Sequence, residues 1–298
     1  MTIDLLKYLR AQGHEVKVYA KQIPKAYTYD GFDVERAVYL RRDISQTFDV
    51  LLTHAEIRTS VISNANMIPY VAVVHNVAGA TLRSLERQAP TLTIANSEYT
   101  RDHIPANAKH HGLGVHVIRP PVLLEPVKGP HDRIGIVNVS IDKGGDVLKY
   151  VAEKNPSIPF LAVQGGHGLQ VESLPSNVEL IAQTPDMASQ YARMRALIFP
   201  TRSETYGKVA AEATQFGVPL IVSDIPALHE VCGNAAIYLD PHNYEGWNYA
   251  VRSMMKDNIH AKWSRLSSAR GKQQRGQSLK DMARFERLLI EATELKER

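Results

Sequence analysis

The sequence predicts an α/β protein made of two doubly wound, Rossmann-like domains that face each other across a cleft. Short apolar runs of strand length alternate with helical stretches along the chain, a pattern typical of parallel sheets covered by helices. The 298 residues exceed the usual size of a single domain. A segment rich in proline and glycine, residues 120–132, separates two similar series of strands and helices and predicts the linker.

The first domain is expected over residues 1–124. Apolar residues at helical spacing between Ile3 and Leu9 predict an opening helix, which ends at Gly13. The alternation that follows predicts a strand, and later apolar runs read as short buried strands of a parallel sheet. The expected strands of this domain are residues 15–20, 48–55, 69–75, 91–98 and 116–121.

The second domain is expected over residues 130–275, where the pattern of strands and helices restarts. A helix is expected directly after Gly207, at the end of a loop that follows a buried strand. The other predicted strands are residues 133–139, 159–166, 177–183, 196–200, 218–224 and 235–241, and the other predicted helices are residues 144–155 and 186–194.

The last part of the chain is amphipathic and basic. Apolar residues at helical spacing predict one or two helices there. Residues 260–298 carry ten lysine and arginine residues against five acidic ones, which suits either a solvated helix or an acidic partner. The apolar positions are Leu266, Met282, Phe285, Leu288, Leu289 and Ala292.

Composition places the chain among globular proteins. Hydrophobic residues make up 44% and charged residues 22%, which excludes a disordered or fibrous protein. Apolar runs stay far below the about 20 residues of a membrane-spanning helix, and no secretory signal opens the sequence. The single cysteine, Cys232, excludes an internal disulfide framework. We therefore expect a cytoplasmic protein without an integral membrane segment.

Two glutamates mark the expected site. Glu204 lies in the loop after a predicted strand, and Glu212 lies eight residues later, inside the helix that Gly207 precedes. A helix start presents unpaired amides and a partial positive charge, which suit a phosphate. One carboxylate in the loop and one inside the helix can bind two different diols of one extended ligand. They do not need to act as an acid–base pair.

The stretch around these glutamates resembles the E-x7-E motif of retaining glycosyltransferases of the GT-B fold, in particular glycosyltransferase family 4. PTRSETYGKVAAEA followed by FGVPLIVSD matches the pattern around the motif. Further similar stretches cover nearly the whole chain, more strongly after residue 130. They are LLKYLRAQGHEVKVYA, VVHNVAG, IANSEYTR, VIRPPV, NVSIDKGGDVL, VQGG, TPDMASQYARMRALIFP and DIPALHEVCGNAAIYLDP, the last with Glu230 in the usual place.

The resemblance implies a role for each matching residue. Glu212 is expected to bind the ribose hydroxyls of the donor, and Glu204 the hydroxyls of the transferred sugar. Lys143 is expected to neutralise the leaving diphosphate, and His75 to lie near the anomeric carbon. The amides near Tyr206 and Gly207 are expected to help Glu204 bind the transferred sugar. The remaining donor-binding positions are Arg202, Tyr206, Gly207 and Lys208.

The implied reaction is that of a retaining hexosyltransferase. A sugar moves from a UDP- or GDP-sugar to an acceptor hydroxyl, and a phosphate oxygen of the donor takes the acceptor's proton on the same face. The resemblance implies no metal and no cofactor, and the chain has no Asp-x-Asp triplet. Likeness to the family also implies that the terminal helix, residues 276–298, packs back on the first domain.

The sequence departs from the family pattern at two points. The family opens with a strand and a glycine-rich loop, whereas this sequence begins almost directly at the first helix. The family also has an arginine shortly before its lysine loop, where this chain reads Asn138, Val139 and Ser140. Arg202 is the residue expected to supply that charge.

Other functions stay open at this point. The same fold serves nucleotide-sugar epimerases, and a shortened amino terminus suits a non-catalytic nucleotide-sugar-binding protein. The acceptor is expected to be a saccharide, a lipid carrier or a modified base in DNA. The basic tail suits the DNA base, and a steep salt dependence of acceptor binding would favour it.

Overall fold

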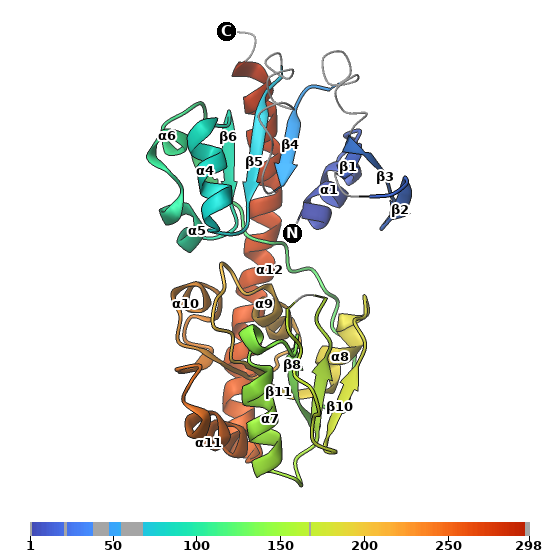
Figure 1. The fold of residues 1–298 in the computed structure, drawn as a ribbon, viewed down its shortest axis with the longest axis vertical. Helices are drawn as coiled ribbons and strands as arrows, with labels where there is room; N and C mark the ends of the chain where they lie inside the picture. Colours follow the sequence, from blue (N-terminus) through green and yellow to red (C-terminus); the bar gives the residue numbers. More distant parts are fainter. Residues whose placement is uncertain (1, 21–22, 38–47, 55–67, 167, 296–298) are drawn as a thin grey trace. The chain divides into compact units, whose positions relative to one another are not determined.

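The computed structural model describes residues 2–20, 23–37, 48–54, 68–166 and 168–295, and its contacts divide the chain into two compact units (Figure 1). Unit 1 comprises residues 1–121 and 278–298, and unit 2 comprises residues 122–277. The amphipathic tail forms a single helix, α12 (Asp257–Glu294), which contributes to both units.

Unit 2 is built on a six-stranded parallel sheet of order β10-β9-β8-β11-β12-β13. The chain starts in the middle of this sheet, adds two strands on one side and then returns to the other side of β8. The strands are β8 (Arg133–Val137), β9 (Phe160–Val163), β10 (Val178–Ile181), β11 (Met194–Phe199), β12 (Leu220–Ser223) and β13 (Ala236–Leu239).

Helices cover both faces of this sheet. Helices α7 (Gly145–Lys154) and α11 (Tyr244–Met254) pack with the strands in one hydrophobic cluster, around the fully buried Trp247. The opposite face is covered by α8 (Met187–Arg193), α9 (Lys208–Gln215) and α10 (Pro226–Cys232). The predicted doubly wound α/β domain is thereby confirmed for unit 2.

Unit 1 contains a four-stranded parallel sheet and a smaller sheet of three strands. In the smaller sheet, β2 and β3 form an antiparallel hairpin that was not predicted from the sequence. Asp30 and Gly31 turn it with φ angles of 51° and 81°, as the commonest two-residue hairpins do. The strands are β1 (Val18–Ala20), β2 (Tyr27–Tyr29) and β3 (Phe32–Arg36), then β4 (Leu51–His54), β5 (Tyr70–Val74), β6 (Leu92–Ala95) and β7 (Val115–Val117).

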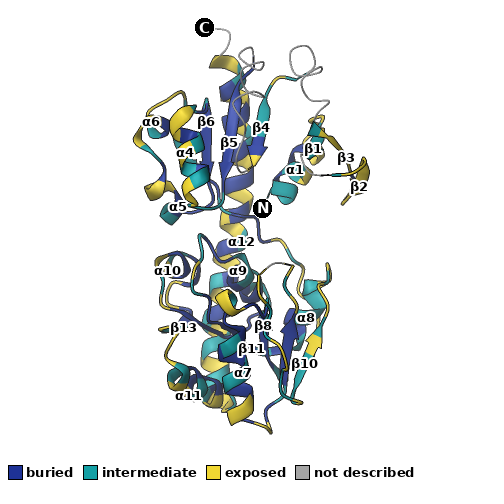
Figure 2. Cartoon of the chain, viewed as in Figure 1, coloured by how far each residue is buried: buried dark blue, intermediate teal, exposed yellow. Residues whose placement is uncertain are grey.

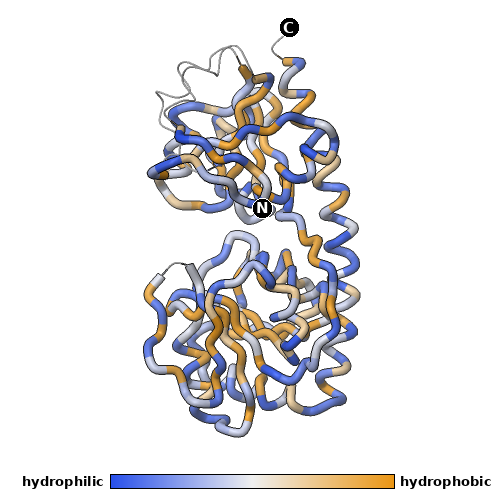
Figure 3. The backbone as a smooth tube through the Cα atoms, turned by 90° about the vertical axis from the view of Figure 1, so that its right-hand side faces the viewer, coloured by the Kyte–Doolittle hydropathy of each residue, from blue (hydrophilic) through white to orange (hydrophobic). Residues whose placement is uncertain are grey.

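Strand β5 is buried on both faces, which explains its continuous apolar sequence. Val71 and Val73 pack in the cluster that includes α1 (Thr2–Ala11) and the end of α12. Tyr70, Ala72 and Val74 pack in the cluster with α4 (Gly79–Arg87) and α6 (Ala106–Lys109); α5 (Glu98–His103) follows β6. The strand is dark blue in Figure 2, and Figure 3 shows hydrophobic stretches running through the inside of each unit.

Helix α12 is fastened to unit 2 by polar side chains. Ser264 and Ser267 donate hydrogen bonds to the carbonyls of Gly217 and Val218, directly after α9. Buried Gln274 donates to the carbonyl of Val231 at 2.8 Å and accepts from the Thr214 hydroxyl at 2.6 Å. These bonds satisfy backbone and side-chain groups at the ends of α9 and α10. Among the helices in the described ranges, none is long and apolar enough to cross a membrane.

Candidate functional site

The strand order of unit 2 defines one switch point, between β8 and β11. The chain leaves β8 toward α7 on one face of the sheet and leaves β11 toward α9 on the other. In open parallel sheets such a divergence leaves a crevice at the carboxyl ends of the two strands, where ligands bind. The two loops there, residues 138–144 and 200–207, contain most of the residues that the sequence predicts for a site.

The loop after β8 is held in shape by unusual backbone conformations. Asn138 has a φ of 69°, and its side-chain oxygen accepts a hydrogen bond from the amide of Ser140. A short turn, η2 (Ile141–Lys143), ends at Gly144, whose φ is 86°. A Cβ at Gly144 would lie 2.2 Å from Cγ of Pro200, so the two loops are in direct contact at a position that requires glycine.

Lys143 and Glu204 form an ion pair across the two loops. The Nζ of Lys143 lies 2.5 Å from Oε1 of Glu204 and donates to the carbonyl of Ser203 at 3.0 Å. The side chains of Lys143 and Glu204 are 28% and 19% exposed, so both can meet a ligand. The structure therefore brings together the two residues that were expected to bind diphosphate and sugar.

Arg202 lies beside this pair but is engaged by another carboxylate. Its guanidinium binds Asp146 of α7 with distances of 2.7 and 3.2 Å and donates to the carbonyl of Ile141. Tyr244 donates to the same carboxylate at 2.5 Å. Burial alone would raise the pKa of Asp146, but the hydrogen bonds from Tyr244 and Arg202 outweigh it and hold the pKa below its usual value. Arg202 thus ties the Lys143 loop to the start of α7.

A hydrogen bond from a buried tyrosine holds the Glu212 carboxylate in place. The hydroxyl of Tyr191, on α8, donates to Oε2 of Glu212 at 2.8 Å, and Lys208 lies 3.5 Å from Oε1. Tyr191 is fully buried, and both this burial and the charge of Glu212 raise its pKa well above the usual value. Tyr191 therefore stays a hydrogen-bond donor, and Glu212 presents a fixed carboxylate that remains 15% exposed.

The start of α9 lies between the two glutamates. Gly207 has a φ of 97°, and a Cβ there would lie 2.5 Å from a methyl group of Leu228, so glycine is required. The amides at the start of α9 lie at the positive end of its dipole. Tyr206 is 5% exposed and packs in the core, so its side chain holds the end of this loop against unit 2.

His75 belongs to unit 1, where it directly follows β5. Its ring stacks on that of His54, which ends β4, with centroids 3.9 Å apart and planes 4° apart. Burial, and then the neighbouring His75, lower the pKa of His54 to about 4. Burial also lowers the pKa of His75. Both rings are therefore neutral at pH 7, at the carboxyl edge of the four-stranded sheet.

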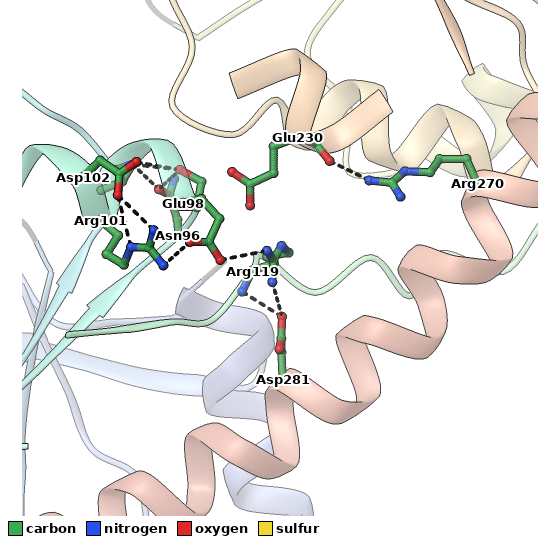
Figure 4. A network of polar contacts seen from close by, with 10 residues as sticks. Asn96, Glu98, Arg101, Asp102, Arg119, Glu230, Arg270 and Asp281 are labelled. Carbon is green, nitrogen blue, oxygen red and sulfur yellow. Dashed lines mark hydrogen bonds and ion pairs between the residues drawn. The ribbon is translucent and has the colours of Figure 1, made fainter. Parts of the chain in front are cut away.

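Figure 4 shows polar contacts around Arg119 in unit 1 and around Glu230 in unit 2. Arg119 binds Glu98 at 3.3 Å, and its amide donates to Asp281 of α12 at 3.1 Å. In unit 2 the carbonyl of Glu230 accepts a hydrogen bond from Arg270 at 2.5 Å. Arg270 thereby caps the end of α10.

Several of these partners were not found from the sequence. Tyr191, Asp146, Tyr244 and His54 come from other elements than the residues they bind, and no spacing in the chain connects them. Of these four, His54 left a signal in the sequence, since it lies next to the end of one predicted strand and His75 ends another. Over the described ranges, no group of three or more His, Cys, Asp or Glu side chains is arranged to bind a metal ion.

Part of unit 2 matches a protein-family model. Residues 147–257 match the family model described as "Glycosyl transferases group 1". This segment runs from α7 to the first residue of α12 and includes Arg202, Glu204 and Glu212. Lys143 lies just before it.

Two bacterial mannosyltransferases share local sequence similarity with the chain. The O-antigen chain mannosyltransferase RfbU of Salmonella typhimurium (strain LT2) is 38% identical over 64 residues, which are 22% of this chain and 18% of that protein. The O-antigen chain mannosyltransferase B of Escherichia coli is 29% identical over 86 residues, or 29% of this chain and 22% of that protein. The matches thus span about a fifth of the length of these relatives.

Solved glycosyltransferase structures share the fold over most of the chain. Sucrose-phosphate synthase of Thermosynechococcus elongatus superposes with a TM-score of 0.76 at 14% identity, over 97% of this chain and 92% of that one. Anabaena HepE, solved with UDP and glucose, superposes with a TM-score of 0.69 at 15% identity, over 87% and 86%. The predicted GT-B fold is confirmed.

Proposed function

We propose that this protein is a glycosyltransferase that moves a sugar from a UDP- or GDP-sugar to an acceptor hydroxyl. One observation carries the proposal: Lys143 and Glu204 pair at the switch point of unit 2, and Glu212 lies on α9, the helix that starts directly after the Glu204 loop. The cationic and amide groups match the diphosphate of such a donor, and the two carboxylates match the hydroxyls of its sugar and its ribose. The family match over residues 147–257 supports the same reaction class.

The diphosphate, the ribose and the sugar of the donor are each proposed to bind groups of unit 2. The diphosphate is proposed to bind the first amides of α9, at Gly207 and Lys208, together with Lys143. The ribose diol is proposed to bind Glu212, which Tyr191 already holds in place. Glu204 and the backbone near Tyr206 are proposed to bind hydroxyls of the transferred sugar. Arg202 supports the Lys143 loop through Asp146.

The chemistry we propose is transfer with retention, of the family 4 type, without a metal ion. The bond between the anomeric carbon and the diphosphate oxygen breaks, and the acceptor oxygen bonds to that carbon on the same face. A phosphate oxygen takes the acceptor's proton. Lys143 stabilises the charge that develops on the diphosphate, the kind of contribution that is often the largest in catalysis. The neutral His75 is proposed to contact the sugar undergoing transfer.

A saccharide is the acceptor that the comparisons favour. The two relatives with local similarity are named as mannosyltransferases of O-antigen chains, and HepE was solved with UDP and glucose. We therefore propose transfer of a hexose to a saccharide hydroxyl. Lipid carriers and modified DNA bases are the other acceptors to be offered in an assay.

A thermal-shift series with UDP, GDP, ADP and their sugar conjugates tests the donor site. A nucleotide at about 100 times its dissociation constant should stabilise the protein by roughly 2.7 kcal/mol. That gain should disappear in Glu212→Ala and persist in Glu153→Ala, which removes an exposed glutamate of α7. Stabilisation that survives Glu212→Ala would contradict the assigned site.

An assay of sugar transfer distinguishes an enzyme from a non-catalytic binding protein. The nucleotide that stabilises the fold is supplied as its radiolabelled sugar conjugate, with a set of saccharide, lipid and DNA acceptors. Transfer of label to any of them, lost in Lys143→Met, supports the proposal. Donor binding without transfer or hydrolysis would favour a non-catalytic nucleotide-sugar-binding protein instead.

A further inference from the structure

The charges of the candidate site compensate one another. Lys143 faces Glu204, Lys208 faces Glu212, and Arg202 faces Asp146. Three cations and three carboxylates leave these six side chains with no net charge. A diphosphate that binds here does not meet an excess of positive charge, and it has to compete with carboxylates already in place.

The competition is sharpest at Lys143. An ammonium group has three protons, and Lys143 directs its hydrogen bonds to the carboxylate of Glu204 and to the carbonyl of Ser203. A phosphate that approaches Nζ therefore comes within a few ångströms of the Glu204 carboxylate, which has the same sign of charge. Either the ion pair breaks or the two anions lie side by side. Both alternatives weaken phosphate binding.

Glu204 and Glu212 are held in different ways. Glu212 accepts a hydrogen bond from the fully buried Tyr191, so it keeps its position whether or not Lys208 stays close. Glu204 has Lys143 as its hydrogen-bonding partner among the described residues. A ligand that draws Lys143 away consequently leaves Glu204 without compensation, unless the ligand itself supplies hydrogen-bond donors.

We propose that Glu204 makes the site discriminate between the intact donor and its nucleoside diphosphate product. This inference rests on the proposed function. The hydroxyls of the donor's sugar replace Lys143 as hydrogen-bond donors to Glu204, whereas the nucleoside diphosphate left after transfer has no hydroxyl at that place. The product therefore meets an uncompensated carboxylate next to its terminal phosphate, and its release is favoured.

The substitution Glu204→Gln tests this proposal. It removes the negative charge and keeps an oxygen and an amide that can bond to sugar hydroxyls. Calorimetric titrations of UDP, UDP-glucose, GDP and GDP-mannose would give the dissociation constants of the wild type and the variant. We expect the nucleoside diphosphate to bind about fivefold more tightly to the variant, the range of a partly exposed ion pair. The sugar conjugate should gain nothing, so the preference for the intact donor disappears.

Two control variants separate this role from a general effect on binding. Glu212→Gln keeps the Lys143–Glu204 pair, so it should weaken both ligands by the same factor and leave their ratio unchanged. The double variant Lys143→Met/Glu204→Gln, compared with Lys143→Met, should show a smaller gain, because no ammonium group is liberated and only the repulsion between carboxylate and phosphate is removed.

The outcomes of these titrations test this inference separately from the proposed function on which it rests. A wild type that binds one of these nucleotides, with a Glu204→Gln variant that binds the diphosphate no better, overturns the inference and leaves the proposed function standing. A wild type that binds none of the four ligands overturns the proposed function, and the inference with it.

Discussion

At the scale of single residues, the stacked pair of His54 and His75 predicts how stability depends on pH. Burial and the neighbouring ring lower the pKa of His54 to about 4, from an ordinary value of 6.5. The folded state therefore binds fewer protons than the unfolded state between these values. The contribution of His54 to stability is complete above pH 6.5 and is lost as the pH falls toward 4.

The substitution His54→Phe should flatten this part of the stability profile. A phenyl ring keeps the stack on His75 but has no proton to gain. Between pH 6.5 and pH 4, the melting temperature of the wild type should fall more steeply than that of the variant. Calorimetry at half-unit steps measures both profiles. The exposed His110→Phe serves as control and should keep the steep fall, whereas parallel profiles for wild type and His54→Phe would refute the assignment.

At the scale of elements, the loop after β8 depends on one glycine. A methyl group at Gly144 would lie 2.2 Å from the Pro200 ring and 2.6 Å from its carbonyl oxygen, and the φ of 86° is itself unfavourable for alanine. Gly144→Ala should cost about 1–2 kcal/mol of folding free energy. It should also displace Lys143 and weaken nucleotide binding on the order of tenfold or more. Chemical denaturation and titration calorimetry measure the two effects.

Gly276 of α12 provides the matched control. It is an exposed helical glycine, and a Cβ there would meet nothing within 4 Å. Gly276→Ala should stabilise the protein by about 0.5–1 kcal/mol and leave nucleotide affinity unchanged. A Gly144→Ala variant with wild-type affinity would show that the two loops do not position the site.

Sequence alone predicted the strands of unit 2 because their signal is local. Runs such as residues 196–200 are buried on both faces and bounded by proline or glycine, so burial is visible in the chain itself. Helix α10 was not predicted, since its sequence was taken only as a stretch similar to the family. The β2–β3 hairpin was missed as well, although its Asp-Gly turn was present.

The sequence predicted the residues of the candidate site that belong to one motif. It did not predict the residues that contact them. The spacing of Glu204 and Glu212 is a property of the chain, whereas the contact of Glu212 with Tyr191 depends on how α8 packs beside α9. Arg202 was expected at the phosphate, and its engagement by Asp146 is a tertiary contact that no local pattern encodes. Pairings between elements follow from packing, and packing is set by the whole fold.

At the scale of the whole molecule, unit 2 should be separable with its site intact. Every residue proposed to bind the nucleotide lies within residues 122–277. A fragment of these residues should fold and bind the nucleotide with an affinity close to that of the full chain. Circular dichroism and calorimetry measure both properties.

A shorter fragment, residues 122–256, tests what α12 contributes to that unit. It lacks Ser267, Arg270 and Gln274, which satisfy carbonyls at the ends of α9 and α10. Buried groups left without a partner cost about 1–3 kcal/mol each, so this fragment should not fold cooperatively. A well-folded short fragment would show that the beginning of α12 is dispensable.

The division of α12 between the units also has a consequence for the order of events on the ribosome. Five apolar residues near its end complete the core around Leu5, Leu9 and Val71, and they are synthesised after all of unit 2. At typical rates of translation, the interval between the two parts of unit 1 lasts on the order of ten seconds or more. During that time the first unit waits with one apolar face uncovered. Both units thus depend on α12 for completion, and until that helix has been made the open face of the first unit is where a chaperone would bind. The five residues are Met282, Phe285, Leu288, Leu289 and Ala292.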